Sequence, residues 1–206
     1  QRQMCIRDSL PIYEKENAFT HLKNYDQIAI IDSDIYVKID SPNIFDTLTE
    51  EYAFGAVAER ELPCAKKYKS KIRKYSKAAF EHLDDVDWKW NHLGAEFYNM
   101  GLMVINSKKF LPYLKNQTPK EFLSRSEFKD FVDGVGYKKW STDQMLLNWW
   151  VKKESIPTKN LDWRYNGLYK GIEDNRLSEA FFVHFFLKDL LPERGENVST
   201  LMEAIK

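Results

Sequence analysis

The chain has 206 residues, enough for one domain with a sizeable core. Its 31 Lys and Arg residues balance 31 Asp and Glu residues, so bulk electrostatics gives no reason to expect nucleic-acid binding. The only cysteines, Cys5 and Cys64, argue against a disulfide framework and fit a reducing, cytoplasmic compartment, and no apolar run of about 18 residues predicts a transmembrane helix.

The first nine residues show neither helical nor strand periodicity. They resemble a translated library adaptor, and a native polar or disordered leader is the alternative. Residues 10–206 contain no internal repeat, low-complexity tract or linker. We therefore expect residues 10–206 to form a single domain.

Helices and strands are expected to alternate through the first half of this domain. Apolar residues at helical spacing predict a helix over 14–25, and the β-branched run Gln27–Ile31 predicts a buried strand. Turn residues then precede a short predicted helix over Ile44–Leu48 and a strand over Tyr52–Ala58. The polar, Lys-rich segment 59–87 favours a helix with loops at its ends.

The second half continues this alternation. A strand is predicted over Phe97–Ile105, and Asn106 and Ser107 then offer a cap for a following helix. The remaining predicted elements are helices over Lys108–Leu114, Lys120–Val132 and Thr142–Glu154, a strand over Phe181–Phe185, and a helix over Ser199–Ile205.

The first strand ends in Asp32-Ser33-Asp34. Hard divalent cations prefer carboxylate oxygens, and Mg²⁺ or Mn²⁺ commonly combines one or two of them with substrate phosphates. Ligands of open α/β sheets bind outside the carboxyl ends of the strands, where this pair lies. The pair therefore predicts a metal site for a phosphorylated ligand. A solvated turn is the alternative, and the apolar residues Ile35–Val37 after the pair disfavour it.

Four segments in order resemble glycosyltransferase family 8, the glycogenin-like and galactosyltransferase group. Together they cover about residues 14 to 188, which makes them more specific than any one of them alone. They match a nucleotide-sugar signature, an F-N-x-G strand, a D-Q-D helix start, and a W-x-x-N turn with a late H-F strand. The segments are Tyr25–Val37, Phe97–Asn106, Thr142–Asn148, and Asp162–Asn166 with Val183–Phe185.

The resemblance implies an α/β architecture of the GT-A type, a Rossmann-like mixed sheet flanked by helices. It also implies transfer of a sugar, with retention of configuration, from a nucleoside-diphosphate sugar to a hydroxyl of a glycan or other acceptor. A UDP-sugar is the favoured donor. The family places a βαβ segment before its Asp-x-Asp strand, so we expect a partial domain that lacks its first βαβ segment. Peripheral membrane contact stays open.

By resemblance, Asp32, Asp34 and His184 would hold the metal. An imidazole among the ligands suits Mn²⁺ better than Mg²⁺. Asp32 and Ser33 would also contact the donor. The alternative for His184, which lies between two apolar residues, is a hydrogen-bonded core histidine.

Resemblance also assigns Asn99, Gly101, Asn166 and Lys188 to donor or acceptor binding. The alternative for Asn99 is the end of a ladder beside a glycine bulge. The alternative for Lys188 is a solvated lysine, because the glycine that follows the family's histidine is missing here.

Asp143 and Gln144 match the family's pair that binds donor-sugar hydroxyls beside the reacting carbon. The same residues could instead only cap a helix and complement its dipole. Gln144 is a poor nucleophile, so the residues give no evidence of a covalent intermediate. Retention therefore rests on the resemblance alone.

Two further segments carry weaker predictions. The polar stretch Trp88–His92 is a candidate acceptor contact, whereas Trp149 and Trp150 follow a helical apolar run and are expected in the core. The lysine-rich run 66–74 is expected to be a solvated helix face.

The alternatives to a transferase are a non-catalytic or inactive fragment of this fold and a metal-dependent nucleotidyltransferase.

Overall fold

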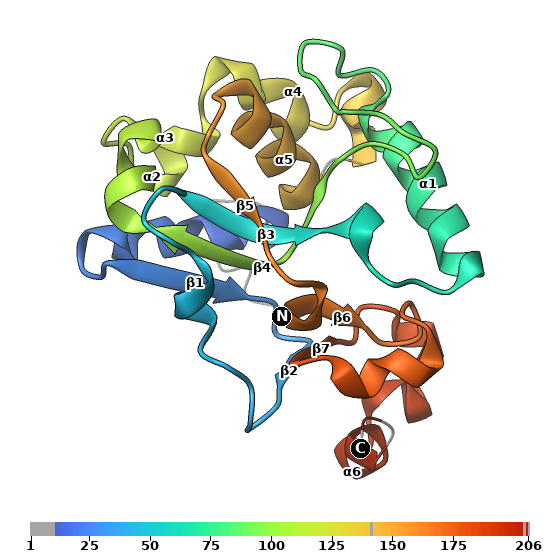
Figure 1. Cartoon of the computed structure of the whole chain (residues 1–206). Coiled ribbons are helices and arrows are strands. Elements are labelled where there is room, and N and C mark those ends of the chain that lie inside the picture. Colours follow the sequence, from blue (N-terminus) through green and yellow to red (C-terminus); the bar gives the residue numbers. More distant parts are fainter. Residues whose placement is uncertain (1–10, 141, 204, 206) are drawn as a thin grey trace, which may run out of the picture.

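The computed structural model describes residues 11–203 and 205, except residue 141 (Figure 1). The prediction for residues 1–9 lies outside this range. Within it, the chain forms two small sheets with helices packed around the larger one, as the α/β interpretation expects. None of the helices in the described part is long and apolar enough to cross a bilayer.

The larger sheet has four strands in the order β1-β4-β3-β5. Strand β4 (Tyr98–Asn106) pairs antiparallel with both β1 (Gln27–Ile31) and β3 (Phe54–Ala58), and β3 pairs parallel with β5 (Thr158–Asn160). Eight of the nine residues of β4 are buried, as the apolar run predicts. The sheet is therefore mixed, and its central strand carries the second predicted motif.

The smaller sheet joins segments that are far apart in the chain. Strand β2 (Ile35–Val37) follows the acidic pair and runs antiparallel to β7 (Phe182–His184), which pairs parallel with β6 (Gly167–Leu168). Only β7 is predicted from its pattern. Strands β2 and β6 are too short for a hydrophobic period to reveal them.

Helices and 3₁₀ turns cover the sheets. The α-helices are α1 (Lys66–Phe80), α2 (Ser107–Leu114), α3 (Pro119–Leu123), α4 (Lys129–Val132), α5 (Asp143–Lys153) and α6 (Val198–Glu203). The 3₁₀ turns are η1 (Pro11–Lys23), η2 (Ile44–Thr47), η3 (Glu59–Glu61), η4 (Ser126–Phe128), η5 (Gly136–Trp140), η6 (Trp163–Asn166), η7 (Asp174–Glu179), η8 (Lys188–Leu190) and η9 (Pro192–Gly195).

Aromatic side chains dominate the core beside the larger sheet. Trp150 is fully buried, with edge contacts to Phe110 at 5.5 Å and Phe122 at 4.7 Å between ring centroids. Trp149 is also buried, so the prediction that both tryptophans belong to the core is confirmed. Trp88 is buried too, 4.4 Å from the Phe80 ring, so its prediction as an acceptor contact is wrong.

Three expected elements differ from their predictions. The helix expected over 14–25 is the 3₁₀ segment η1. The helix expected over Lys120–Val132 is broken into α3, η4 and α4, because Arg125 turns inward and its guanidinium bonds the Tyr113 carbonyl at 2.8 Å and the Gln117 side chain at 2.7 Å. Strand β1, expected to be buried, is only half-buried, because it lies at the edge of the sheet.

Candidate functional site

Strand pairing brings the acidic pair against both sheets. The backbone N–H of Asp32 donates to the Gly101 carbonyl at 2.8 Å, which extends the β1–β4 ladder by one residue. The Asp34 carbonyl accepts from the Phe185 N–H at 2.8 Å, beside the pair formed by Ile35 and His184. The two carboxylates therefore lie where the two sheets meet.

Asp32, Asp34 and His184 form a cluster suited to a metal. Nε2 of His184 lies 3.3 Å from Oδ1 of Asp34 and 3.9 Å from Oδ2 of Asp32. One ligand atom from each residue lies within 4.8 Å of the others. Ligands about 2.1 Å from a common cation are separated by about 3–4 Å, so the cluster needs little contraction to hold one. The three residues predicted as metal ligands are thus together, whichever cation they bind.

The two carboxylates of this cluster differ electrostatically. The main reason that the pKa of Asp34 lies below its ordinary value is the hydrogen bond that Nε2 of His184 donates to it whenever that nitrogen carries a proton. Burial raises the pKa of Asp32, although Lys15 opposes that shift. A divalent cation would favour the ionised form of both carboxylates.

A series of hydrogen-bonded, buried polar side chains lies behind His184. Nδ1 of His184 lies 2.9 Å from Oδ1 of Asn166, whose amide nitrogen donates to Oδ1 of Asn99 at 2.9 Å. The Asn99 amide nitrogen donates to Glu59 at 3.3 Å, and the Tyr68 hydroxyl donates to the other oxygen of Glu59 at 3.0 Å. Burial raises the pKa of Glu59, and these two hydrogen bonds oppose that shift.

Lys15 joins two of the acidic residues. Its Nζ lies 2.7 Å from Oδ1 of Asp32 and 2.7 Å from Oδ2 of Asp143, and it donates to the Met100 carbonyl at 3.0 Å. Burial opposes the charge of Lys15, but the ion pairs with Asp143 and Asp32 raise its pKa overall. Lys15 thus connects η1 to the end of β1 and the start of α5.

The first turn of α5 faces the middle of β4. Oε1 of Gln144 accepts from the Met100 N–H at 3.2 Å, and its Nε2 donates to the Tyr75 hydroxyl at 3.4 Å. One turn later, the buried Asn148 side chain accepts from the Tyr98 N–H at 2.7 Å and donates to the Tyr98 carbonyl at 2.8 Å. These bonds fix where Asp143 and Gln144 lie relative to the strand.

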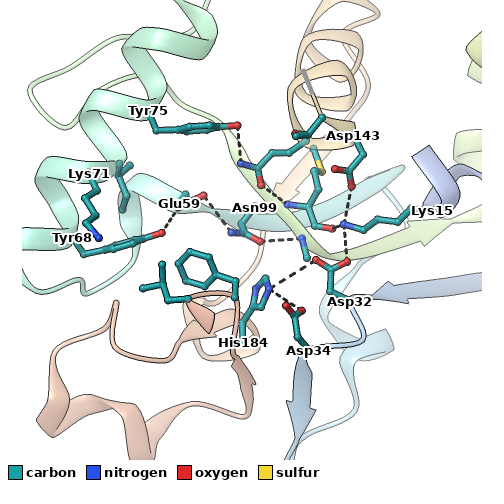
Figure 2. A pocket seen from close by; sticks show the side chains of 17 residues that line it. Lys15, Asp32, Asp34, Glu59, Tyr68, Lys71, Tyr75, Asn99, Asp143 and His184 are labelled. Carbon is teal, nitrogen blue, oxygen red and sulfur yellow. Dashed lines mark hydrogen bonds and ion pairs between the residues drawn. The ribbon is translucent and has the colours of Figure 1, made fainter. Parts of the chain in front are cut away.

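These groups share one open cavity of about 450 Å³ (Figure 2). Of the predicted site residues, Ser33, Asn166 and Lys188 do not line it. The cavity is lined by Lys15, Asp32, Asp34, Glu59, Tyr68, Lys71, Ile72, Tyr75, Asn99, Met100, Gly101, Thr142, Asp143, Gln144, His184, Phe186 and Leu187.

Sequence reasoning expected a helix within 59–87 but missed that one face of this helix, α1, lines the cavity. Tyr68, Ile72 and Tyr75 follow one another at helical spacing, which marks an apolar face within the lysine run. Tyr68 and Ile72 are buried and Lys71 lines the cavity, so the prediction that the whole run is solvated is wrong in part. Lys15 carried no signal of its own.

Comparison with known proteins finds similarity in structure. No protein-family model matches the chain, and no curated protein matches it in sequence. The bifunctional glycosyltransferase WbbM in its apo form superposes with a TM-score of 0.55 at 14% identity, over 94% of this chain and 35% of WbbM. The galactosyltransferase LgtC, in complex with donor and acceptor sugar analogues, superposes with a TM-score of 0.50 at 17% identity, over 84% of this chain and 57% of LgtC.

This chain has a GT-A glycosyltransferase fold. It spans about a third of the length of WbbM and somewhat over half of LgtC. In this GT-A fold, the cluster of Asp32, Asp34 and His184 and the cavity lie at the carboxyl end of β1, which is where open α/β sheets bind their ligands.

Proposed function

We propose that this chain is a metal-dependent glycosyltransferase of family 8. It moves a hexose from a nucleoside-diphosphate sugar, in our proposal a UDP-sugar, to a hydroxyl of a glycan or other acceptor. The observation that supports this most strongly is the Asp32, Asp34 and His184 cluster in an open cavity of about 450 Å³ in a GT-A fold. The order of the four sequence segments supports the choice of family.

The positions of the site residues suggest separate roles in metal binding and in sugar binding. Asp32, Asp34 and His184 would hold Mn²⁺ or Mg²⁺, which when bound supplies charge neutralisation for the donor diphosphate and its departure. Asp143 and Gln144, at the start of α5, also line the cavity and would bind hydroxyls of the transferred sugar. The roles of Asn99, Ser33 and Lys188 in donor or acceptor binding stay predictions.

The transfer breaks the bond between the anomeric carbon and the diphosphate oxygen and forms a bond to the acceptor oxygen. The acceptor's proton leaves with the diphosphate, so no strong base is needed. Retention of configuration, proposed from the family resemblance, requires attack from the face that the diphosphate leaves. Lys15 would hold Asp32 and Asp143 in place through its two ion pairs while charge develops on the departing diphosphate.

The test is binding of Mn²⁺ and nucleotide to the chain as it exists. We expect UDP with Mn²⁺ to raise the melting temperature, and UDP-glucose or UDP-galactose with Mn²⁺ to release UDP. Asp34→Asn should remove both effects, whereas Asp40→Asn, a change of an exposed carboxylate just after β2, should keep them. If the unmodified chain shows neither a shift nor UDP release, the proposal is wrong and a non-catalytic role for the fold is favoured.

A further inference from the structure

Asn166 is buried, with no exposed surface, and it does not line the cavity. Its side chain lies between His184 and Asn99, so it can act on the site only through these two residues, and its contact with His184 is to Nδ1. The hydrogen-bond chain from the sheet to His184 determines which nitrogen of the imidazole carries a proton.

The direction of this chain is set by the backbone. The N–H of Gly101 lies 2.9 Å from the Asn99 side chain, and a backbone N–H can only donate. The Asn99 atom that it meets must therefore be the amide oxygen. The Asn166 atom that also meets this oxygen, at 2.9 Å, must then be its NH₂ group.

The remaining assignment follows from the amide geometry. With its NH₂ on Asn99, Asn166 presents its carbonyl oxygen to Nδ1 of His184, 2.9 Å away. An oxygen without hydrogens can only accept, so Nδ1 must carry a proton. In the neutral imidazole, Nε2 is then the atom with the free lone pair, and it is the atom that faces Asp32 and Asp34.

Burial makes this assignment firm. His184, Asn99, Glu59 and Tyr68 are each more than nine-tenths buried, as is Asn166, so water has little access to replace a missing partner. The other end of this hydrogen-bond series agrees with the assignment, because the NH₂ group of Asn99 donates to a carboxylate oxygen of Glu59, which can only accept. A lone pair aimed at two carboxylates is repulsive unless a cation lies between them.

We propose that Asn166 is a positioning residue that holds His184 in the Nδ1–H tautomer and so presents Nε2 as a ready-made metal ligand. The orientation is anchored at the Gly101 N–H through Asn99. This inference rests on the proposed function for its metal, but the tautomer itself can be measured without metal or sugar. Partners behind a metal-binding histidine commonly contribute 10–100-fold to metal affinity.

The first experiment reads the tautomer. Histidine ¹⁵N spectra of the metal-free chain, recorded at the alkaline end of a pH titration, identify which ring nitrogen is protonated. The His184 signal is assigned by its loss in His184→Gln. We expect the Nδ1–H form in the unmodified chain, and a gain of the Nε2–H form in Asn166→Ala, because Nε2–H can donate to Asp34.

The second experiment reads Mn²⁺ affinity by electron paramagnetic resonance. Asn166→Ala should bind Mn²⁺ about 10–100-fold more weakly. Asn166→Asp keeps an acceptor for Nδ1–H, so it should restore most of the affinity even if it folds less stably. Ser76→Ala removes another fully buried hydrogen-bonding side chain, which bonds to Arg73 and Ala95 and does not line the cavity, and it should leave the tautomer and Mn²⁺ affinity unchanged.

The outcomes separate this inference from the proposed function. An Nε2–H tautomer in the unmodified chain, or unchanged Mn²⁺ affinity in Asn166→Ala, overturns the role of Asn166 while leaving a glycosyltransferase possible. If the unmodified chain has the expected tautomer but binds no Mn²⁺, the proposed function fails and the orientation of His184 stands.

Discussion

The imidazole of His184 occupies the space that a side chain at position 101 would need. A Cβ atom on Gly101 would lie 2.4 Å from Cε1 of His184 and 2.8 Å from its Nδ1. It would also lie 2.9 Å from Oδ1 of Asn99, the atom that accepts the Gly101 N–H. The His184 ring can therefore keep its position only if residue 101 has no side chain, because both residues belong to buried strands that have little room to shift.

Replacing Gly101 with alanine should displace the His184 ring. Overpacking of this kind costs about 1–3 kcal/mol of folding free energy. We also expect Mn²⁺ affinity to fall by at least about 10-fold, since the ligand and its partner Asn99 are both disturbed. Urea unfolding and Mn²⁺ titration measure the two effects.

Gly55→Ala on the neighbouring strand β3 is the matched control. Its Cβ would meet only side-chain carbons, of Leu161 and Leu48, both at 3.0 Å. It should therefore lower stability without changing Mn²⁺ affinity. If both variants lose Mn²⁺ binding to the same extent, the contact between Gly101 and His184 is not the cause.

Lys15→Met removes the ammonium group of Lys15 and keeps an unbranched apolar side chain, so it tests the contribution of the charge alone. The change leaves Asp32 and Asp143 without their shared cation, and we expect it to lower the free energy of unfolding by about 1–3 kcal/mol. Added Mn²⁺ should recover part of this loss, because a cation at Asp32 restores some of the missing charge. Lys23→Met, at the exposed end of the same 3₁₀ segment, should show neither effect. An equal response of the two variants to Mn²⁺ would contradict this role.

Glu16 makes stability fall as the pH rises. Burial raises its pKa to about 8, the charge of Asp143 adds to the shift and Lys15 opposes it, and its carboxyl oxygens make no hydrogen bond to the described residues. Because its pKa is higher in the folded than in the unfolded state, the neutral form stabilises the fold most below about pH 4.5, and this contribution is lost as the pH rises to about 8.

Glu16→Gln should remove that dependence. The slope reaches at most about 1.4 kcal/mol per pH unit, so the variant should be more stable than the unmodified chain at pH 8, with the difference shrinking toward pH 5. Urea unfolding at several pH values measures the difference. Glu50→Gln, at an exposed position, should show the same dependence of stability on pH as the unmodified chain. If the stability of Glu16→Gln also changes with pH as that of the unmodified chain does, Glu16 is not the source of the dependence.

Local patterns predicted most of the side chains that share the cavity. Asp32 and Asp34 end a strand, Asn99 and Gly101 interrupt an apolar strand, and Asp143 begins a helix, so each is visible as a polar break in a hydrophobic period. The fold class follows from the same alternation. What brings these breaks together is strand pairing, which the sequence shows only through the family resemblance.

Contacts between distant segments could not be predicted. Lys15 reaches the site from a 3₁₀ segment whose pattern resembles an ordinary amphipathic helix. Glu59 is recognised only by what it touches, 40 residues from Asn99 in the chain. Asn166, which the resemblance assigns to donor or acceptor binding, is buried against Asn99 and His184 and does not line the cavity. Trp88 is misleading for the opposite reason, because a polar sequence surrounds a side chain that packs on Phe80.

Asp143→Asn should separate catalysis from metal binding. Asp143 lines the same cavity as Asp32, Asp34 and His184 without belonging to their cluster, and its carboxylate lies 2.7 Å from Lys15, which also pairs with Asp32. The asparagine keeps the size of the side chain but loses the ion pair that aligns it, and a misplaced sugar-binding group can cost about 10²-fold in rate. We therefore expect the rate of sugar transfer to fall by about 10²-fold while Mn²⁺ affinity changes little.

Initial rates with the donor that proves active, together with Mn²⁺ titration, measure the two quantities. Asp174→Asn, at an exposed residue outside this cavity, is the control for loss of one negative charge. An equal fall in transfer rate and Mn²⁺ affinity in Asp143→Asn would place Asp143 with the metal ligands instead of the sugar-binding wall.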